Sequence, residues 1–270
     1  MNNEKHIKFT PGLAAAVASL ALASAPAHGA LVGHWEFDNS GDVGQATVST
    51  SLETVGDAAY SASGKVGGAL SLDGSGDYLR VDASHTLASG LPTGDASYTI
   101  AAFIQTTANV RNTVTYWGNL STAQSNGFRT TTVNEAAITQ NSTGGILNWG
   151  FARDFGHGAG GTPPGTIYDG QWHHIAATYD SATSTKRLYF DGVELGSGLV
   201  IADLNVAATG FTLGATRTGG EGFNGLIDDV RVYDNVLSQS EISALSSIPE
   251  PSAAALLGLG GLALAFRRRK

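Results

Sequence analysis

The clearest folding signal in the chain is a pair of neighbouring strand-like runs followed by the dipeptide Asp191-Gly192. Residues 172–179, WHHIAATY, and residues 186–190, KRLYF, are rich in aromatic, aliphatic and β-branched side chains. A polar segment separates them, and residues 193–195 resume the apolar pattern after the Asp-Gly pair. An Asp-Gly pair between apolar runs favours a tight hairpin, because glycine adopts positive φ without a steric penalty. This stretch therefore predicts an antiparallel meander.

Other apolar or alternating runs predict further strands on both sides of this hairpin. They lie at residues 31–38, in two segments within 69–81, and at 98–105, 113–117, 128–133, 146–151, 211–215 and 226–233. Residues 153–165, RDFGHGAGGTPPG, contain too much Gly and Pro for a regular element and predict a long mobile loop. Ser238 and Glu241 have the spacing of a capping box, which predicts a short helix over residues 239–245.

Three patterns along the chain resemble laminin-G-like, concanavalin A-like proteins. They are WHHIAATYD followed by LYFDGVEL, the earlier GALSLDGSGDYL, and the closing run GLIDDVRVYDNVLSQSEI. The resemblance covers residues 31–245, with no internal repeat. It implies an all-β fold: an antiparallel two-sheet β-sandwich, or jelly roll, with a short C-terminal helix and with sorting helices at the two ends of the chain. We expect the sandwich domain to occupy residues 31–247.

Composition narrows the class of partner. The chain has no cysteine, so neither disulfides nor thiolate metal ligands are available. Residues 31–248 hold nine of the 15 basic residues and 21 of the 23 acidic ones, which is a net charge of −12. Nucleic-acid binding relies on basic groups that neutralise phosphates, so this acidic body excludes it and suits neutral sugars or divalent cations.

Residues 1–30 have the pattern of a secretory signal peptide. Lys5 and Lys8 precede an apolar run at 13–25, and the small residues around Ala27 offer two cleavage sites. The alternative is an Ala-rich amphipathic helix, but the run has no polar stripe. We therefore expect export.

Residues 248–270 resemble a PEP-CTERM sorting segment. Pro249, Glu250 and Pro251 precede an apolar run at 253–266, and three Arg and a Lys end the sequence. Fourteen helical residues span only ~21 Å, less than the ~30 Å hydrocarbon core of a bilayer. The resemblance implies transient inner-membrane retention, processing by an exosortase-type enzyme, and a final location at the cell envelope or outside the cell. The alternative is an ordinary C-terminal anchor.

An enzymatic function has little support in the sequence. Glu36 and Asp38 begin a Glu-x-Asp-x-x-Glu pattern of retaining glycosidases, but Gly41 stands where the second Glu is required. A lyase could draw on His157, His173, His174 and Tyr179, although their spacing does not demand it. No Gly-x-Ser-x-Gly elbow occurs. Adjacent strand residues point to opposite faces, so the His173-His174 pair predicts one packed and one exposed imidazole rather than a metal site.

A calcium site is a hypothesis that the acidic residues leave open. Asp38, Ser40 and Asp42 offer hard oxygen donors at alternate positions, but Ser49 replaces the Glu that an EF-hand needs. Asp228 shares strand parity with Val230 and Val232, which predicts a core-facing carboxylate. The resemblance implies one structural Ca²⁺ between the first and last strands, held by Asp38 and Asp228 with Asp42 or Asp229 assisting. The alternative is that these residues cap turns and form a solvated edge.

The resemblance also implies a binding module without catalytic activity. We expect a polysaccharide ligand, with a protein-binding adhesive or structural matrix protein as the alternative. Sugar sites combine aromatic platforms with a few polar groups. The candidate ligand-binding residues are Trp117, Trp149, Arg153, Asp154 and His157. For each Trp, burial in the core is the competing interpretation.

Overall fold

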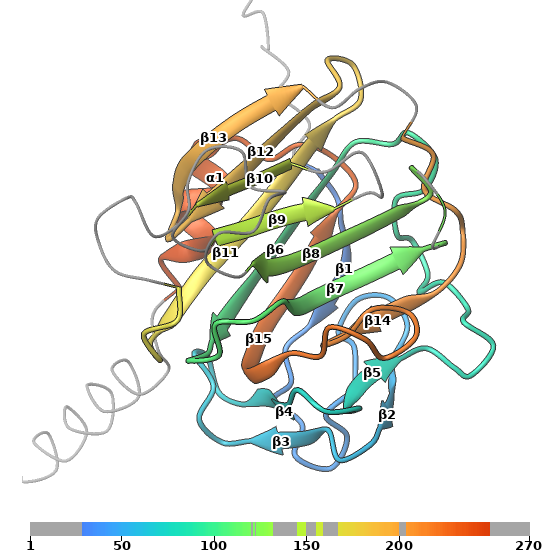
Figure 1. Ribbon diagram of the computed structural model, residues 1–270, viewed down its shortest axis with the longest axis vertical. Coiled ribbons are helices and arrows are strands. Elements are labelled where there is room, and N and C mark those ends of the chain that lie inside the picture. Colours follow the sequence, from blue (N-terminus) through green and yellow to red (C-terminus); the bar gives the residue numbers. More distant parts are fainter. Residues whose placement is uncertain are drawn as a thin grey trace, which may run out of the picture.

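The computed structural model of this chain describes residues 29–119, 121, 123–131, 145–149, 155–158, 167–199 and 204–248. Within these ranges the chain forms two antiparallel β-sheets and a short helix. The strands of the second sheet lie over those of the first, so that apolar side chains are enclosed between them (Figure 1). This arrangement is the predicted β-sandwich.

The first sheet has eight strands, and its two long central strands follow directly from the sequence. Strand β6 spans Tyr98–Gln105, the range that its apolar run predicts, and pairs with β11 at Trp172–Asp180. The strand order is β13 (Val193–Leu199), β12 (Thr185–Phe190), β11, β6, β15 (Asn224–Tyr233), β4 (Ala69–Asp73) and β3 (Ala59–Ser61), with β1 (Leu31–Trp35) also paired to β15.

The second sheet has seven strands and includes the middle of the chain. Its order is β10 (Phe155–Gly158), β9 (Gly145–Trp149), β8 (Ser125–Thr131), β7 (Asn112–Gly118), β14 (Phe211–Leu213), β5 (Tyr78–Arg80) and β2 (Glu53–Val55). Strand β10 lies inside the segment for which the sequence predicts a loop. That prediction is wrong for residues 155–158, because pairing with β9 supplies backbone partners that local composition does not reveal.

The core between the sheets is built on aromatic residues. Trp35 and Phe211 stack with ring centroids 4.7 Å apart, and Trp117 packs against both Tyr98 and Phe211. Aromatic pairs of this kind add about 0.5–1.5 kcal/mol beyond the burial of their surface. The contacts join β1, β6, β7 and β14, so they bind the two sheets to each other.

The hairpin between β12 and β13 confirms the Asp-Gly prediction. Asp191 has φ 47° and Gly192 has φ 78°, the two positive values that a type I′ turn requires. The carboxylate of Asp191 also accepts a hydrogen bond from the backbone N–H of His174 at 2.9 Å. The turn is therefore tied to the neighbouring strand β11 as well as to its own hairpin.

Helix α1, Gln239–Ser246, begins at the predicted capping box. The Ser238 hydroxyl accepts from the backbone N–H of Glu241, and the Glu241 carboxylate accepts from the backbone N–H of Ser238 at 2.7 Å. Ile242 packs with Ala101 and Tyr189 in a second, smaller apolar cluster on the outer face of the eight-stranded sheet. No helix in the described part of the chain is both long and apolar enough to span a bilayer.

The end of the first strand departs from the prediction. Strand β1 stops at Trp35, because Phe37 adopts the left-handed conformation with φ 57°. A bulky aromatic residue pays a steric penalty of about 1–2 kcal/mol in this region. The buried ring of Phe37, which is 1 % exposed, holds the bend in place and redirects Asp38.

Candidate functional site

Strand β15 changes neighbours at Asp228 and Asp229. Residues up to Ile227 pair with β4, and residues from Val230 pair with β1. A bulge separates the two halves, with Asp229 at φ 48°. The bulge shifts the alternation by one residue, so Ile227 faces the main core and Asp228 stands opposite Phe103 on the other face. The predicted core-facing parity of Asp228 is therefore wrong.

Asp228 is nevertheless fully buried. Its Oδ2 accepts a hydrogen bond from the backbone N–H of Val66 at 2.8 Å, while its Oδ1 has no hydrogen-bond partner. Burial raises the pKa of Asp228 to about 7, and the nearby charge of Asp229 acts in the same direction. A buried carboxylate oxygen without a partner is costly unless a proton or a cation compensates it.

The loop before β4 that contains Val66 also contacts Asp38. Its Oδ1 accepts from the backbone N–H of Gly68 at 2.7 Å, two residues after the amide that Asp228 uses. Amides two residues apart lie within about 7 Å of each other. Each of the two predicted carboxylates therefore accepts a hydrogen bond from one backbone amide of the same short loop.

Asp229 and Asp42, the two residues expected to assist in calcium binding, have different surroundings. Burial would raise the pKa of Asp229, but the hydrogen bond with His34 at 2.6 Å and the charge of Arg231 at 2.9 Å outweigh it and lower the pKa. Asp229 is therefore already engaged in an ion-pair network. Asp42 lines a hollow of about 410 Å³, whereas Asp38 lines a separate hollow of about 210 Å³.

A second acidic group was not predicted from the sequence. Oxygen atoms of Asp57, Asp73 and Asp77 all lie within 4.8 Å of one another. Buried Asp77 accepts from the backbone N–H groups of Asp73 at 2.6 Å and Ser75 at 3.1 Å, so it stabilises the Gly-rich turn between β4 and β5. The Asp73–Asp77 spacing is visible in the sequence, but the approach of Asp57 depends on the fold.

The outer face of β7 and β8 forms a polar surface. Phe128 and Trp117 belong to the core, so alternation directs Tyr116 and Gly127, which pair with each other, to the opposite face. Two residues on from Gly127, Arg129 also points outward, and it pairs with Thr113. The polar surface consists of Thr113, Tyr116, Ser125, Arg129 and Thr131.

These outward side chains are almost entirely buried. The hydroxyls of Thr113 and Thr131 are inaccessible to solvent and make no hydrogen bond. Two loops fold toward the surface: the Tyr168 hydroxyl donates to the Thr131 carbonyl, and the backbone N–H of Thr113 donates to the carbonyl of Glu221 at 2.9 Å. These hydroxyls therefore belong to a polar layer beneath the loops, and accessible polar groups lie at its rim.

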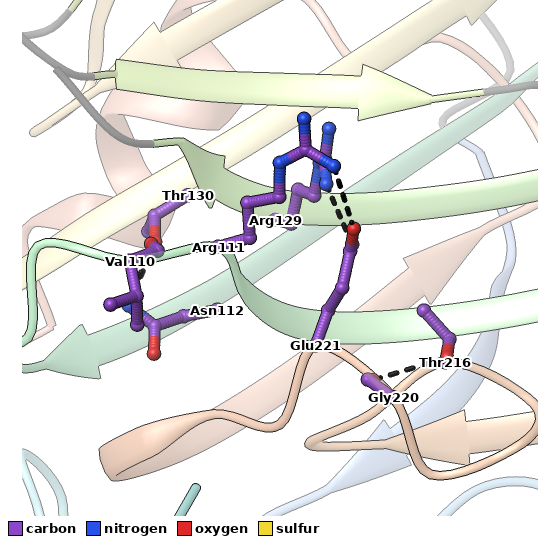
Figure 2. Close-up of polar contacts among 8 residues, drawn as sticks. All are labelled: Val110, Arg111, Asn112, Arg129, Thr130, Thr216, Gly220 and Glu221. Atoms are coloured by element: carbon purple, nitrogen blue, oxygen red, sulfur yellow. Dashed lines mark hydrogen bonds and ion pairs between the residues drawn. The ribbon is translucent and has the colours of Figure 1, made fainter. Parts of the chain in front are cut away.

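Two arginines converge on one carboxylate at the rim of this polar surface (Figure 2). Arg111 Nη1 lies 3.1 Å from Glu221 Oε1, and Arg129 Nη1 lies 2.6 Å from Glu221 Oε2. The side chain of Arg129 is 7 % exposed and that of Arg111 is 50 % exposed. Sequence reasoning missed these three residues, because they are separated by 110 and 92 positions.

The loops that carry these charges are held by their own hydrogen bonds. The buried Asn112 amide donates to the carbonyl of Ala108 at 2.8 Å. It also donates to the carbonyl of Val110 at 3.2 Å (Figure 2), and the two bonds position Arg111 between them. On the facing loop, the Thr216 hydroxyl donates to the Gly220 carbonyl at 3.1 Å. The position of Glu221 is therefore built by the fold and does not depend on the ion pairs alone.

Comparison with known proteins places this sandwich in a family. A laminin G domain model of the concanavalin A-like lectin/glucanases superfamily matches residues 73–243, more than half of the chain. The chain belongs to the concanavalin A-like lectin/glucanase superfamily. A second model, the PEP-CTERM protein-sorting motif, matches residues 247–270. Both predicted resemblances are confirmed, and the sorting motif marks this laminin-G-like protein for export.

Among curated proteins, this laminin-G-like chain matches part of a much larger protein. It is 36 % identical over 95 residues to the Sushi, von Willebrand factor type A, EGF and pentraxin domain-containing protein 1 of Rattus norvegicus, and 38 % identical over 96 residues to that of Mus musculus. The match covers 32 % of this chain and only 3 % of either relative.

Solved structures share the sandwich at low sequence identity. Domain 4 of AbnA, a GH43 extracellular arabinanase from Geobacillus stearothermophilus solved with arabinotriose, has a TM-score of 0.61 at 22 % identity and covers 81 % of this chain and 99 % of its own. The binding domain of Paraclostridial Mosquitocidal Protein 1 has a TM-score of 0.57 at 14 % identity, with 80 % and 51 % covered. At these identities the likeness shows the fold alone.

Three of the predicted ligand-binding residues of this laminin-G-like sandwich, Trp117, Trp149 and His157, lie on the described strands β7, β9 and β10. Trp117 lies in the core with its Nε1–H donating to the Pro92 carbonyl at 2.9 Å, so the competing interpretation holds for it. Trp149 stands opposite Gly127 in the β8–β9 ladder, and His157 stands opposite Ile146 in the β9–β10 ladder. Arg153, Asp154 and the sorting residues Pro249, Glu250 and Pro251 lie outside the described residues.

Among the residues considered for a lyase, His173 and Tyr179 are described with their side chains, and these lie far apart. His173 bonds Asp191 at 2.9 Å and Asp169 at 3.1 Å, whereas the Tyr179 hydroxyl donates to Asp95. Six residues of extended strand separate the two side chains by about 20 Å. Both His173 and His174 are buried, so the expected exposed imidazole is not found, although the two rings do lie on opposite faces of the sheet.

Proposed function

We propose that this exported laminin-G-like sandwich is a non-catalytic binding module of the cell envelope or extracellular matrix, with a polysaccharide as its ligand. The observation that carries the proposal is the charged rim of Arg111, Arg129 and Glu221, where the side chains of Arg111 and Glu221 are 50 % and 27 % exposed beside the polar surface on β7 and β8. Accessible charged groups that are held in place by a polar framework can bind a ligand with many polar groups. The arabinotriose complex of the arabinanase domain shows that a sandwich of this shape can accompany sugar binding in another protein.

Protein adhesion is the alternative, and the described surface gives it less support. Among the described residues, the exposed large apolar side chains are Val110 and Val193, on separate elements. Protein-binding patches usually join several such residues into a continuous area. A hydrolytic or lyase function is less favoured still, because the motif that begins at Glu36 is incomplete and His173 and Tyr179 lie at opposite ends of β11.

We also propose one structural Ca²⁺ held by Asp38 and Asp228. The fit rests on the buried Oδ1 of Asp228, which has no partner although its other oxygen is bonded. Calcium prefers carboxylate and carbonyl oxygens, and the carboxylates of Asp38 and Asp228 both contact the loop at residues 64–68. The ion would neutralise the buried charge of Asp228. It would also link strands β1, β4 and β15 where β15 stops pairing with β4 and starts pairing with β1.

The sorting motif also supports a proposal for how the protein is exported and processed. Residues 1–30 would be removed on export, the tail at 248–270 would hold the protein briefly at the inner membrane, and an exosortase-type enzyme would process it. The sandwich at 31–247 would then reside at the envelope surface or outside the cell.

A glycan array probed with the purified mature protein tests the proposed ligand class. One array should contain calcium and a second should contain chelator. Binding to one class of polysaccharide is expected, and it should weaken in chelator. An array that stays blank in both conditions, together with specific capture of a protein from the envelope, would replace the polysaccharide proposal with adhesion.

A further inference from the structure

Glu221 presents a carboxylate to two guanidinium groups at the edge of the proposed sugar-binding surface. Each oxygen of the carboxylate meets a different arginine, at 3.1 Å from Arg111 and 2.6 Å from Arg129. Guanidinium groups bind planar carboxylates with defined geometry. The space between Arg111 and Arg129 therefore fits a carboxylate group. In this respect Glu221 stands in for an external carboxylate.

The two arginines differ in solvent exposure, and this difference suits a recognition site. Arg129 is anchored in the central ladder of β7, β8 and β9, and its side chain is 7 % exposed. Arg111 lies on the loop before β7, and half of its side chain is open to solvent. A buried, oriented cation beside an accessible one allows a ligand to enter from solution and to meet a preorganised partner.

The side chain of Glu221 can leave the two arginines while its loop stays in place. It lies in the sequence Gly219-Gly220-Glu221-Gly222, and its own φ is +49°, which a side-chain-bearing residue adopts only at some cost. Its side chain is 27 % exposed. Because its backbone carbonyl is anchored to β7 through Thr113, the side chain can turn away without release of the loop.

Basic residues are gathered around this site, although the domain as a whole is acidic. Residues 31–248 hold nine basic residues in an acidic body, and three of them, Arg111, Arg129 and Arg217, belong to this surface or its rim. Burial raises the pKa of the Tyr116 hydroxyl, while the positive charge of Arg217 opposes that rise, which puts Arg217 within electrostatic reach of the polar surface. The acidic body would otherwise repel an anionic polymer.

We infer that the Arg111–Glu221–Arg129 cluster selects acidic polysaccharides, by binding the carboxylate of a uronic acid in the place that Glu221 occupies in the free protein. This inference rests on the proposed function, because it assigns a ligand class to the same surface. Glu221 acts as an internal competitor: it keeps the arginines aligned when no ligand is bound, and it lowers affinity because the ligand must displace it. Neutral sugars lack the group that would make this exchange favourable.

Two variants with opposite expected effects test the inference. The probes are oligogalacturonates and the same oligomers after full methyl esterification, which removes the charge and keeps the sugar. In isothermal titration of the mature protein at low ionic strength, the acid form should bind and the ester should bind at least tenfold more weakly. Arg111→Gln should weaken binding of the acid form by about tenfold, whereas Glu221→Gln should strengthen it.

Arg80→Gln is the matched control. Arg80 forms a comparable ion pair with Glu53 at 2.7 Å in the same sheet but away from the cluster, so its loss should leave binding unchanged. Melting temperatures of all variants separate binding losses from unfolding, and Arg111, being half exposed, can be replaced without opening the core.

Each other outcome is decisive. Equal affinity for the acid and ester forms would overturn the inference and leave polysaccharide binding intact. Binding of sulfated but not uronate oligomers would also overturn the carboxylate assignment. A loss of affinity in Glu221→Gln would show that Glu221 supports the site and does not compete for it. If neither oligomer binds and the glycan array is blank as well, the proposed function fails together with the inference.

Discussion

His173 and His174 are neighbours in β11 with opposite electrostatic surroundings. Both ring nitrogens of His173 meet carboxylates, those of Asp191 and Asp169, and although burial lowers its pKa these partners raise it above the ordinary value. His174 lies on the other face, edge-on to Phe103, with its Nδ1 unbonded. Burial lowers the pKa of His174 to about 4, against smaller opposing effects of Asp191 and Asp229.

Acid should therefore destabilise the fold through His174. The unfolded chain binds a proton near the ordinary pKa of 6.5, whereas the folded chain binds it only near pH 4. Between these values the unfolded state holds more protons, so stability falls as pH falls, by up to about 3 kcal/mol. Urea unfolding of His174→Gln at pH 7 and pH 4.5 should show a smaller acid loss than the unchanged protein.

His173→Gln is the matched comparison and should act in the other direction. Because the folded pKa of His173 is raised, its stabilisation is complete below pH 6.5 and disappears as pH rises through the folded value. This variant should lose stability at pH 5.5 and little at pH 9. Identical pH profiles for both variants and the unchanged protein would contradict the assigned environments.

At the scale of elements, the β12–β13 hairpin and helix α1 hold each other in place. The Gly192 carbonyl accepts from the Ser243 hydroxyl at 2.9 Å and from the Gln239 side chain. A Cβ at Gly192 would lie 2.3 Å from Ser246 Oγ and 3.2 Å from Ser243 Cα, so the serine side chain and the helix backbone would both have to shift to admit it. The second apolar cluster, around Ile242 and Tyr189, depends on the close approach of turn and helix.

Gly192→Ala should destabilise the protein by about 2–3 kcal/mol, the sum of strain at positive φ and displacement of the helix. Gly76→Ala is the control, because Gly76 has φ 85° and open space around its absent Cβ. It should lose about 1 kcal/mol from backbone strain alone. Thermal unfolding measures both, and equal losses would show that the helix does not constrain the turn.

At the scale of the whole molecule, residues from the two ends of the sandwich sequence, Asp38 and Asp228, contact the same loop. The loop at residues 64–68 contacts both carboxylates and leads directly into β4. A cation at this junction would connect three strands that are far apart in the chain. Its removal should therefore be felt as a loss of global stability and not as a local change.

Chelation should lower the melting temperature of the mature protein, by several degrees if the ion contributes ~2 kcal/mol. Asp228→Ala should abolish that sensitivity, because the unpartnered oxygen is gone. Asp42→Ala, whose side chain lines a different hollow, should retain it. A melting temperature that does not respond to chelator or to added Ca²⁺ would remove the proposed ion.

The sorting segment should act independently of the sandwich. Deletion of residues 249–270 should leave a soluble exported protein with the melting temperature of the unchanged domain, because the described core ends at helix α1. Fractionation of cells that express the deletion measures this. A truncated protein that stays in the membrane fraction would show that another part of the chain retains it.

Local patterns were sufficient for much of the architecture. The bounds of β6, the Asp191-Gly192 hairpin and the capping box at Ser238 follow from alternation, turn chemistry and side-chain capping, which act within a few residues. The family resemblance also follows from contiguous motifs. Asp38 and Asp228 could be paired only through that resemblance.

Tertiary structure decided the rest, because the deciding contacts join distant residues. The bulge at Asp229 arises where β15 exchanges one neighbour for another, and it reverses the face that alternation assigns to Asp228. The convergence of Arg111 and Arg129 on Glu221 spans 110 and 92 positions and has no local signature. Strand pairing, which depends on the whole core, creates that site.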